Sequence, residues 1–213
     1  MVCRDFYTIL LDLNPDTRQL LSGMGRDTRY EIRRAADKDQ LTYDCRNGKD
    51  EDAFQQFCDY YDDFAMRKGQ PGINRSWLSL LAAAGALTMS RVTDEAGETL
   101  VWHVYHRSNE RATLFYSASL FRKFADSVMR NKIGRANRWQ HWQDILKFKS
   151  EGVSTYDFGG WYQGDQDQER LRINKFKEEF GGEIVKNYIC ERALTAKAKL
   201  FLRVRRLMLG DAI

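Results

Sequence analysis

Proline and long apolar runs are both scarce in this chain of 213 residues. Its two prolines, Pro15 and Pro71, are too few for proline-rich linkers or disordered tails. No apolar run reaches the roughly 18 residues that a membrane-spanning helix needs, and the first residues lack the apolar core of a signal peptide. We therefore expect a cytoplasmic protein that does not span a membrane.

Cysteine is also sparse, and its spacing is uninformative. The four cysteines, Cys3, Cys45, Cys58 and Cys190, form no CxxC pair and match no metal-binding pattern. In a cytoplasmic protein thiols stay reduced. The sequence therefore predicts four reduced thiols and no metal site.

The charge balance excludes little. The chain has 34 basic and 30 acidic residues, a net charge of +4, which is too small to indicate nucleic-acid binding unless the basic residues cluster. Hydrophobic residues at 43% and charged residues at 30% are typical of a globular domain, and the length suffices for one sizeable core.

The most informative stretch runs from Ser154 to Gly182. A β-favouring run ends at Gly159 and Gly160, a polar loop follows, and a helix then ends at a second glycine pair. Asp165 or Asp167 can cap this helix. Ile173, Phe176 and Phe180 fall on one face, and Lys177 lies at its edge. We interpret this strand, loop and helix as one wall of an active site.

Three motifs in this order carry a family resemblance. TYDFGG, a loop and then FKEEFGG resemble the C-terminal signature of the FemABX-type aminoacyltransferases, which are built from GNAT-like N-acyltransferase domains. RANRWQHWQDILKFKSEG resembles the helix before that signature, and RDTRYEIRRAADKDQL the basic helix that opens the family's second domain. The resemblance spans roughly residues 6–188.

The fold expected from pattern and resemblance is one GNAT-like α/β domain over residues 1–213, with a mixed sheet of about seven strands. Runs 87–92, 99–106 and 112–120 predict an antiparallel meander. A helix over 134–149 links the last of these to the strand at 154–158, which predicts a right-handed parallel βαβ unit. The resemblance implies that these two strands splay and that the acyl donor enters between them.

Candidate chemical groups lie near the first glycine pair. The resemblance places a functional Phe-Lys pair at Phe176 and Lys177, with Lys177 stabilising an oxyanion; the alternative is an ordinary surface lysine. Asp157 either receives a proton or orients the amine, or it is a hydrogen-bond acceptor that holds the glycine loop. Gly159 and Gly160 allow either a tight turn or the close approach of a ligand.

Phosphate-binding candidates lie elsewhere in the sequence. The segment Gly134, Arg135, Asn137 and Arg138 is predicted to open the crossover helix and to hold a pyrophosphate or tRNA phosphate there. It differs from the Gly-rich loop of acetyl-CoA-dependent GNAT enzymes, which leaves a tRNA donor open. Arg29 and Arg33 share a helix face that is either solvated or turned to phosphate. Tyr116 and Tyr156 are further hydrogen-bond donors, whereas His103, His106 and His141 are expected to be packed or surface residues.

The function implied is transfer of an activated acyl or aminoacyl group to an amine of a cell-envelope precursor, peptidoglycan or polysaccharide, with acyl-CoA or charged tRNA as the donor and no tightly bound cofactor. The alternatives are an acyl-CoA-dependent N-acetyltransferase for a small amine or amino sugar, and a non-catalytic binding module. FemABX enzymes carry two such domains, so a homodimer, a different acceptor or further chain would complete the site. The basic amphipathic helix over 195–209, within a tail of 195–213, either packs on the domain or contacts the inner membrane surface.

Overall fold

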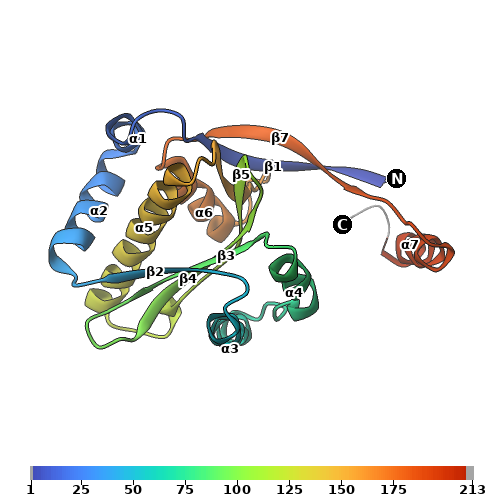
Figure 1. The fold of residues 1–213 in the computed structure, drawn as a ribbon, viewed down its shortest axis with the longest axis horizontal. Helices are drawn as coiled ribbons and strands as arrows, with labels where there is room; N and C mark the ends of the chain where they lie inside the picture. Colours follow the sequence, from blue (N-terminus) through green and yellow to red (C-terminus); the bar gives the residue numbers. More distant parts are fainter. Residues whose placement is uncertain (1, 210–213) are drawn as a thin grey trace.

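The computed structural model describes residues 2–209, which form one mixed sheet between two layers of helices (Figure 1). The strand order is β2-β3-β4-β5-β6-β1-β7. The strands are β1 (Val2–Asp12), β2 (Thr42–Asn47), β3 (Leu87–Thr93), β4 (Thr99–Arg107), β5 (Arg111–Ser119), β6 (Thr155–Gly160) and β7 (Glu183–Glu191). The helices are α1 (Thr17–Gly23), α2 (Arg26–Lys38), α3 (Glu51–Lys68), α4 (Arg75–Ala83), α5 (Ser127–Ser150), α6 (Gln168–Glu178) and α7 (Ala196–Leu209), with a 3₁₀ turn η1 at Leu120–Arg122.

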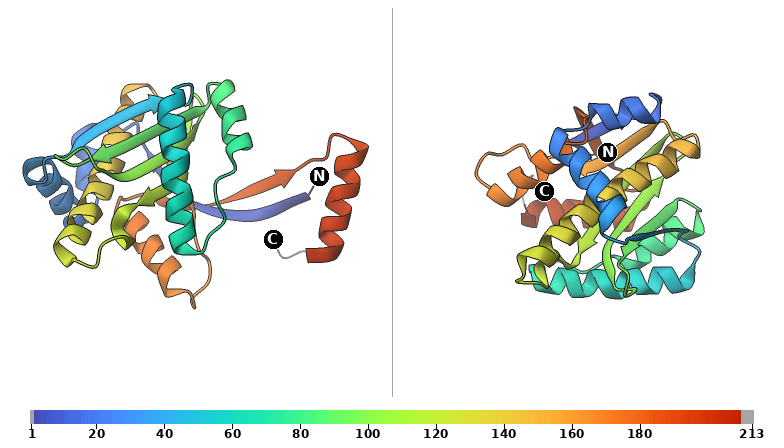
Figure 2. Two further views of the ribbon diagram at one scale, coloured as in Figure 1. Left: turned by 90° about the horizontal axis from the view of Figure 1, so that it is seen from below. Right: turned by 90° about the vertical axis from the view of Figure 1, so that its left-hand side faces the viewer.

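The core has two sides because β4 is buried on both faces. Trp102 and Val104 pack against Phe57 and Leu78 of α3 and α4. Tyr105, on the other face, packs in the cluster that α1, α2 and α5 close. Figure 2 shows α3 and α4 on the side of the sheet away from α1 and α2. The alternation of strand side chains thus sends successive residues into separate clusters.

The sheet opens at its one parallel junction among the described strands. β5 and β6 pair in parallel over Arg111–Thr113 and Thr155–Asp157, and no pair follows farther along. A bulge leaves Phe115 of β5 as an extra residue against β4, and a second bulge on β6 places Asp157 opposite Leu10 but Gly160 opposite Thr8. Bulges bend the strand that carries them and disrupt its ladder. The predicted mixed sheet, parallel βαβ unit and divergent strands are therefore present.

The crossover helix does not begin where the sequence predicted. α5 starts at Ser127, where Asp126 accepts hydrogen bonds from the backbone of Val128 and Met129. Gly134 therefore lies inside the helix, and the prediction that it opens a helix N-terminus is wrong. The backbone N–H groups of residues 134–138 are committed to the helix ladder and cannot hold a phosphate.

The two ends of the sequence meet in β1 and β7. Their antiparallel pairing runs from Val2 opposite Glu191 to Leu10 opposite Glu183. Cys3 lies opposite Cys190, and the structure joins the two in a disulfide across 187 residues. The prediction of four reduced thiols is therefore wrong for this pair, because strands that are remote in sequence bring the two side chains together. Cys45 and Cys58 are free.

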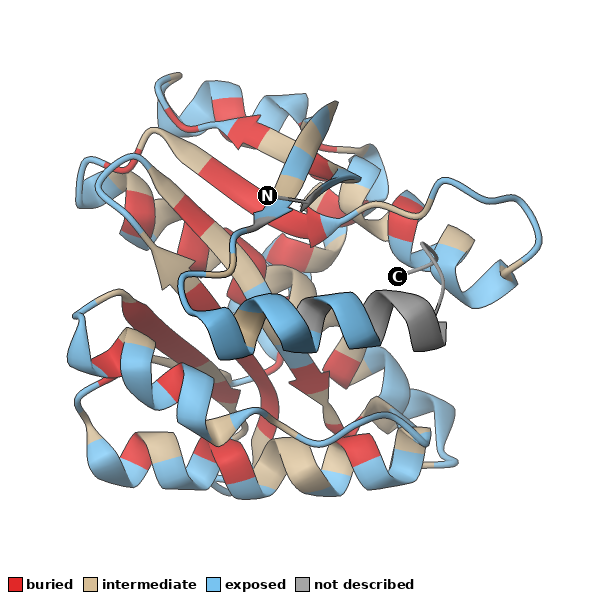
Figure 3. Ribbon diagram, turned by 90° about the vertical axis from the view of Figure 1, so that its right-hand side faces the viewer, coloured by how far each residue is buried: buried red, intermediate tan, exposed pale blue. Residues whose placement is uncertain are grey.

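The C-terminal helix stands away from the two-layered body. α7 follows β7 at the far end of the arm that β1 and β7 form (Figures 1 and 2). In Figure 3, exposed residues run along the described part of this helix. Within residues 2–209, no helix is long and apolar enough to cross a membrane.

Candidate functional site

The glycine pair at the end of β6 forms a bulge that a buried carboxylate holds together. Gly159 has φ of 71°, a conformation that suits glycine. Asp157 Oδ1 accepts a 2.9 Å hydrogen bond from the Gly159 backbone N–H and a second from the Thr8 hydroxyl. That hydroxyl also lies 2.8 Å from the Gly159 carbonyl oxygen. Thr8 of β1 therefore ties the bulge to the neighbouring strand.

The second oxygen of Asp157 is bound to β5. Arg111 donates to Asp157 Oδ2 from Nε at 3.0 Å and from Nη2 at 2.5 Å. The carboxylate is 1% exposed, whereas the Arg111 side chain is 34% exposed. This bidentate pair joins β5 to β6 where their parallel pairing ends. With both oxygens occupied, the contacts of Asp157 favour the interpretation that it positions the glycine loop.

Lys177 places its amine on this bulge. Lys177 Nζ lies 2.5 Å from the Gly160 carbonyl oxygen and 3.4 Å from that of Gly159. Burial lowers the pKa of Lys177 to about 8, and the nearby Asp157 charge partly opposes that shift. A lysine ammonium has three N–H donors. The two carbonyls engage two of them, so one is left for a further acceptor.

The helix that carries Lys177 is oriented by its other faces. Asp167 caps it, and Asn174 donates to the Tyr162 carbonyl at 2.7 Å. Phe176 lies beneath the Arg138 guanidinium, 4.9 Å from the ring centre. The predicted apolar face is only partly correct, because Phe180 is buried whereas Ile173 is 40% exposed.

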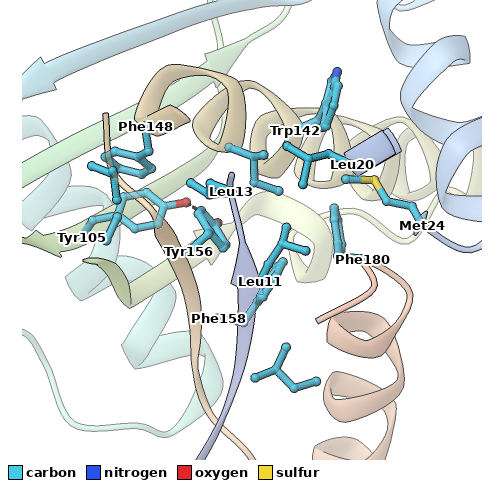
Figure 4. Close-up of a cluster of buried hydrophobic side chains, with 14 of the residues drawn as sticks. Leu11, Leu13, Leu20, Met24, Tyr105, Trp142, Phe148, Tyr156, Phe158 and Phe180 are labelled. Carbon is cyan, nitrogen blue, oxygen red and sulfur yellow. Dashed lines mark hydrogen bonds between the residues drawn. The ribbon is translucent and has the colours of Figure 1, made fainter. Parts of the chain in front are cut away.

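A buried polar network extends below the site, beneath α5. His103 Nδ1 lies 2.8 Å from Asp144 Oδ2, which also accepts from the Tyr105 hydroxyl at 2.6 Å. The Tyr105 and Tyr156 hydroxyls are 2.7 Å apart, and Tyr156 is 2.7 Å from His141 Nδ1. Figure 4 shows the rings of Tyr105 and Tyr156 side by side in the core. The sequence analysis missed this network as a unit.

The network is uncharged at its end nearest to Lys177. Burial, together with the nearby His103, Lys177 and Arg138, lowers the pKa of His141 well below its usual range. Its ring packs against Phe158, Phe176 and Phe180, with centroids 5.2–5.5 Å away. Burial also raises the pKa of Tyr105 and of Tyr156 well above the usual range. Neutral His141 thus supports the wall behind Phe176.

Several predicted site residues do not join Lys177. Tyr156 is fully buried, and Tyr116 packs on Tyr61 of α3, with ring centres 4.8 Å apart. Arg29 donates to the Met24 and Ser22 carbonyls, which hold the end of α1. Arg33 bonds the backbone of its own helix.

The predicted phosphate-binding side chains of α5 have protein partners. Arg135 forms a bidentate pair with Asp39 of α2. Arg138 Nη2 lies 3.1 Å from Glu179 Oε2, which also accepts from Thr28. Asn137 Oδ1 is 2.9 Å from His103 Nε2. Of this group, Arg138 is next to Phe176 and so adjoins the Lys177 helix.

The structure also has a groove of about 720 Å³ away from Lys177. It is lined by the end of β1, by α1, by the first residue of β6 and by the start of β7. Lys177 meets the opposite end of β6, at Gly159 and Gly160. We therefore place the candidate site at the opening between β5 and β6 and assign no chemistry to the groove.

Comparison with known proteins supplies fold-level similarity alone. No family model matches the chain, and no curated protein matches it in sequence. Among solved structures, FemX superposes with a TM-score of 0.68 at 15% identity, over 84% of this chain and 59% of FemX. This chain thus spans little more than half of FemX.

Two further structures cover nearly the whole chain. The C-terminal domain of a protein assigned as a lysylphosphatidylglycerol synthetase in Agrobacterium fabrum gives a TM-score of 0.62 at 13% identity, over 99% of this chain and 68% of that one. L-PGS from Bacillus licheniformis gives 0.55 at 13% identity, over 96% and 67%. With its seven-stranded mixed sheet, its parallel β5–β6 junction and this likeness to FemX, the chain has the FemABX-type, GNAT-like fold.

Proposed function

We propose that this protein transfers an aminoacyl group from a charged tRNA to an amine of a cell-envelope component. The observation that carries the proposal is the position of Lys177, whose amine lies on the β6 bulge where the sheet opens between β5 and β6. The FemX and lysylphosphatidylglycerol synthetase structures, whose names indicate envelope-related aminoacyl transfer, support this class of reaction.

The roles of the residues follow from the contacts around the bulge. The acceptor amine attacks the ester carbonyl of the donor, a C–N bond forms, and the ester C–O bond breaks as the amine proton passes to the leaving tRNA hydroxyl. The free N–H of the Lys177 ammonium donates to the oxyanion that develops in between. Asp157, Thr8 and Arg111 hold the bulge, and Phe176 fixes the helix that carries Lys177.

The start of α5 favours tRNA over acyl-CoA as the donor. The N–H groups that a pyrophosphate would use there are bound by the Asp126 carboxylate, and a second anion at that position is electrostatically unfavourable. Arg135 is engaged by Asp39. An acyl-CoA-dependent N-acetyltransferase therefore has less support from the structure than an aminoacyltransferase.

The test compares transfer by wild type, Lys177→Met and Lys175→Met. Lys175 is exposed on the same helix and is the matched control. The protein is incubated with a pool of tRNA charged with radiolabelled amino acids and with amine-bearing peptidoglycan precursors, and in parallel with acetyl-CoA. We expect amide product from charged tRNA, reduced about 100-fold or more by Lys177→Met and unchanged by Lys175→Met.

Other outcomes would reassign the function. Product from acetyl-CoA alone would support the small-molecule N-acetyltransferase. Full activity in Lys177→Met would refute the oxyanion role. Charged tRNA that raises the melting temperature of the protein without turnover would indicate a binding module.

A further inference from the structure

The arm formed by β1 and β7 extends beyond the rest of the sheet. β1 pairs with β6 over Thr8–Asp12, but its pairing with β7 continues outward to Val2. The outer part is therefore a two-stranded ribbon, with the Cys3–Cys190 disulfide across it. An isolated two-stranded ribbon is marginally stable in water. The crosslink holds the two strands in register where the chain leaves for α7 (Figure 2).

The described part of α7 exposes apolar side chains to solvent. Leu200 is 64% exposed, Phe201 65% and Val204 42%. Leu194, just before the helix, is 83% exposed, and Tyr188 on the arm is 64% exposed. The alternative that α7 packs on the domain does not fit these exposures. A run of exposed apolar residues over one element marks a contact surface.

The same helix carries charge of one sign. Its sequence, AKAKLFLRVRRLML, contains five basic residues and no acidic one. Lys197, Lys199 and Arg203 are exposed alongside the apolar side chains. Lys186 on the arm adds a fourth cation near Tyr188, 5.5 Å from the ring centre, although it also pairs with Asp5. The complementary surface is therefore both apolar and anionic.

We infer that α7 and the end of the β1–β7 arm dock the protein on the surface of an anionic lipid bilayer. A basic amphipathic helix lies in the headgroup region with its apolar side chains between the acyl chains and its cations at anionic headgroups. A nucleic acid would neutralise the lysines and arginines but would leave Leu200, Phe201 and Val204 in water. A second α7 would bring like charges together. This docking does not depend on the proposed reaction.

The test is sedimentation of the full chain with vesicles of phosphatidylcholine alone and with vesicles that also contain phosphatidylglycerol. We expect binding to the anionic vesicles, weakened by salt. Lys199→Glu and Arg203→Glu should each lower the partition coefficient at least about fivefold, since each basic residue near an anionic surface favours binding by about that factor. Phe201→Ser should lower it for the loss of apolar insertion. Lys175→Glu, on the exposed face of α6, is the control and should bind as wild type does.

Three results would overturn this inference. The first is no sedimentation with anionic vesicles. The second is binding that the charge reversals at 199 and 203 leave unchanged. The third is a wild-type dimer in solution that Phe201→Ser converts to a monomer without any effect on vesicle binding, which would assign the apolar side of α7 to a second copy of the chain. All three variants alter exposed side chains, so an unchanged melting temperature confirms that each is folded.

Discussion

Replacement of Asp157 by alanine removes the acceptor that holds the β6 bulge. Three groups lose a partner, namely the Gly159 backbone N–H, the Thr8 hydroxyl and the Arg111 guanidinium. Their costs differ. The Gly159 N–H belongs to a buried residue and is left without an acceptor, which costs about 1–3 kcal/mol. Thr8 keeps its bond to the Gly159 carbonyl, and Arg111 is exposed enough for water to solvate it, so the lost pair adds only about 1 kcal/mol.

We therefore expect Asp157→Ala to lower the free energy of unfolding by about 3 kcal/mol. Urea denaturation measures the change as a shift in midpoint at an unchanged slope. Asp157→Asn retains an acceptor for the Gly159 N–H and should lose less. Asp165→Ala is the control, since Asp165 is exposed in the loop before α6, and a change at such a position stays within about 0.5 kcal/mol.

A loss below about 1 kcal/mol for Asp157→Ala would refute the positioning role that the contacts of Asp157 indicate. The transfer assay adds a second criterion. An Asp157→Asn protein of nearly wild-type stability that has lost activity would show that the carboxylate takes part in the chemistry, as the sequence analysis also allowed. If activity falls only in proportion to stability, Asp157 acts through the bulge.

Three further perturbations test the same neighbourhood and the arm. Gly159→Ala should lower the unfolding free energy by roughly 2–4 kcal/mol, because φ is positive and the new Cβ would lie 2.7 Å from the Leu114 carbonyl oxygen, whereas Gly160→Ala should be close to neutral; equal urea midpoints for the two variants would contradict this. The folded-state pKa of Lys177 lies below its unfolded value, so the unfolded chain binds more protons between about pH 8 and 10.5, and stability contributed by this group rises across that window, by about 2 kcal/mol from pH 7.5 to 9.5; Lys177→Met should abolish the rise in urea denaturation at the two pH values, and an undiminished rise would place the titration elsewhere. Cys190→Ser should lower the unfolding free energy by about 2–5 kcal/mol under oxidising conditions and make stability insensitive to reductant, while Cys45→Ser should leave that sensitivity intact.

The sequence predicted the parts of the fold that have local signals. The meander of β3, β4 and β5 follows from alternating side chains and turn residues. The cap of α4 at Asn74 and the break between α1 and α2 after Gly23 also follow from residue type. Nothing local links β1 to β7, because their pairing joins residues that are 187 positions apart at the disulfide. Reduced thiols were predicted for that reason.

The error at α5 has a different origin. Asp126 followed by Ser127 is an ordinary capping signal, but Gly134 suggested a later start. A Cβ at Gly134 would meet no atom within 4 Å, so neither packing nor turn geometry requires a glycine there. Placing the helix start at this residue also placed Arg135 and Arg138 at a phosphate site, whereas both have carboxylate partners.

The candidate site was only partly accessible to sequence reasoning. Phe176, Lys177 and the glycine pair were identified by motif, and the structure brings them together with Asp157. The partners of Asp157 were not identified, because Thr8 and Arg111 come from strands whose register only the folded sheet defines. The His103 network did have a signal. His103 and Tyr105 alternate on one face of β4, and His141 and Asp144 are three residues apart on α5.

The central position of β1 in the sheet has a consequence for how the chain folds during synthesis. β1 is made first, yet both of its sheet neighbours, β6 and β7, are made last. While the ribosome completes the intervening segment, the apolar run Ile9 to Leu13 has no strand to pair with and must stay exposed or be shielded by other factors. The β2–β5 meander with α3 and α4 can assemble earlier from nearby segments. Closure of the sheet, with its many contacts of long sequence separation, should therefore be the slow, final step of folding.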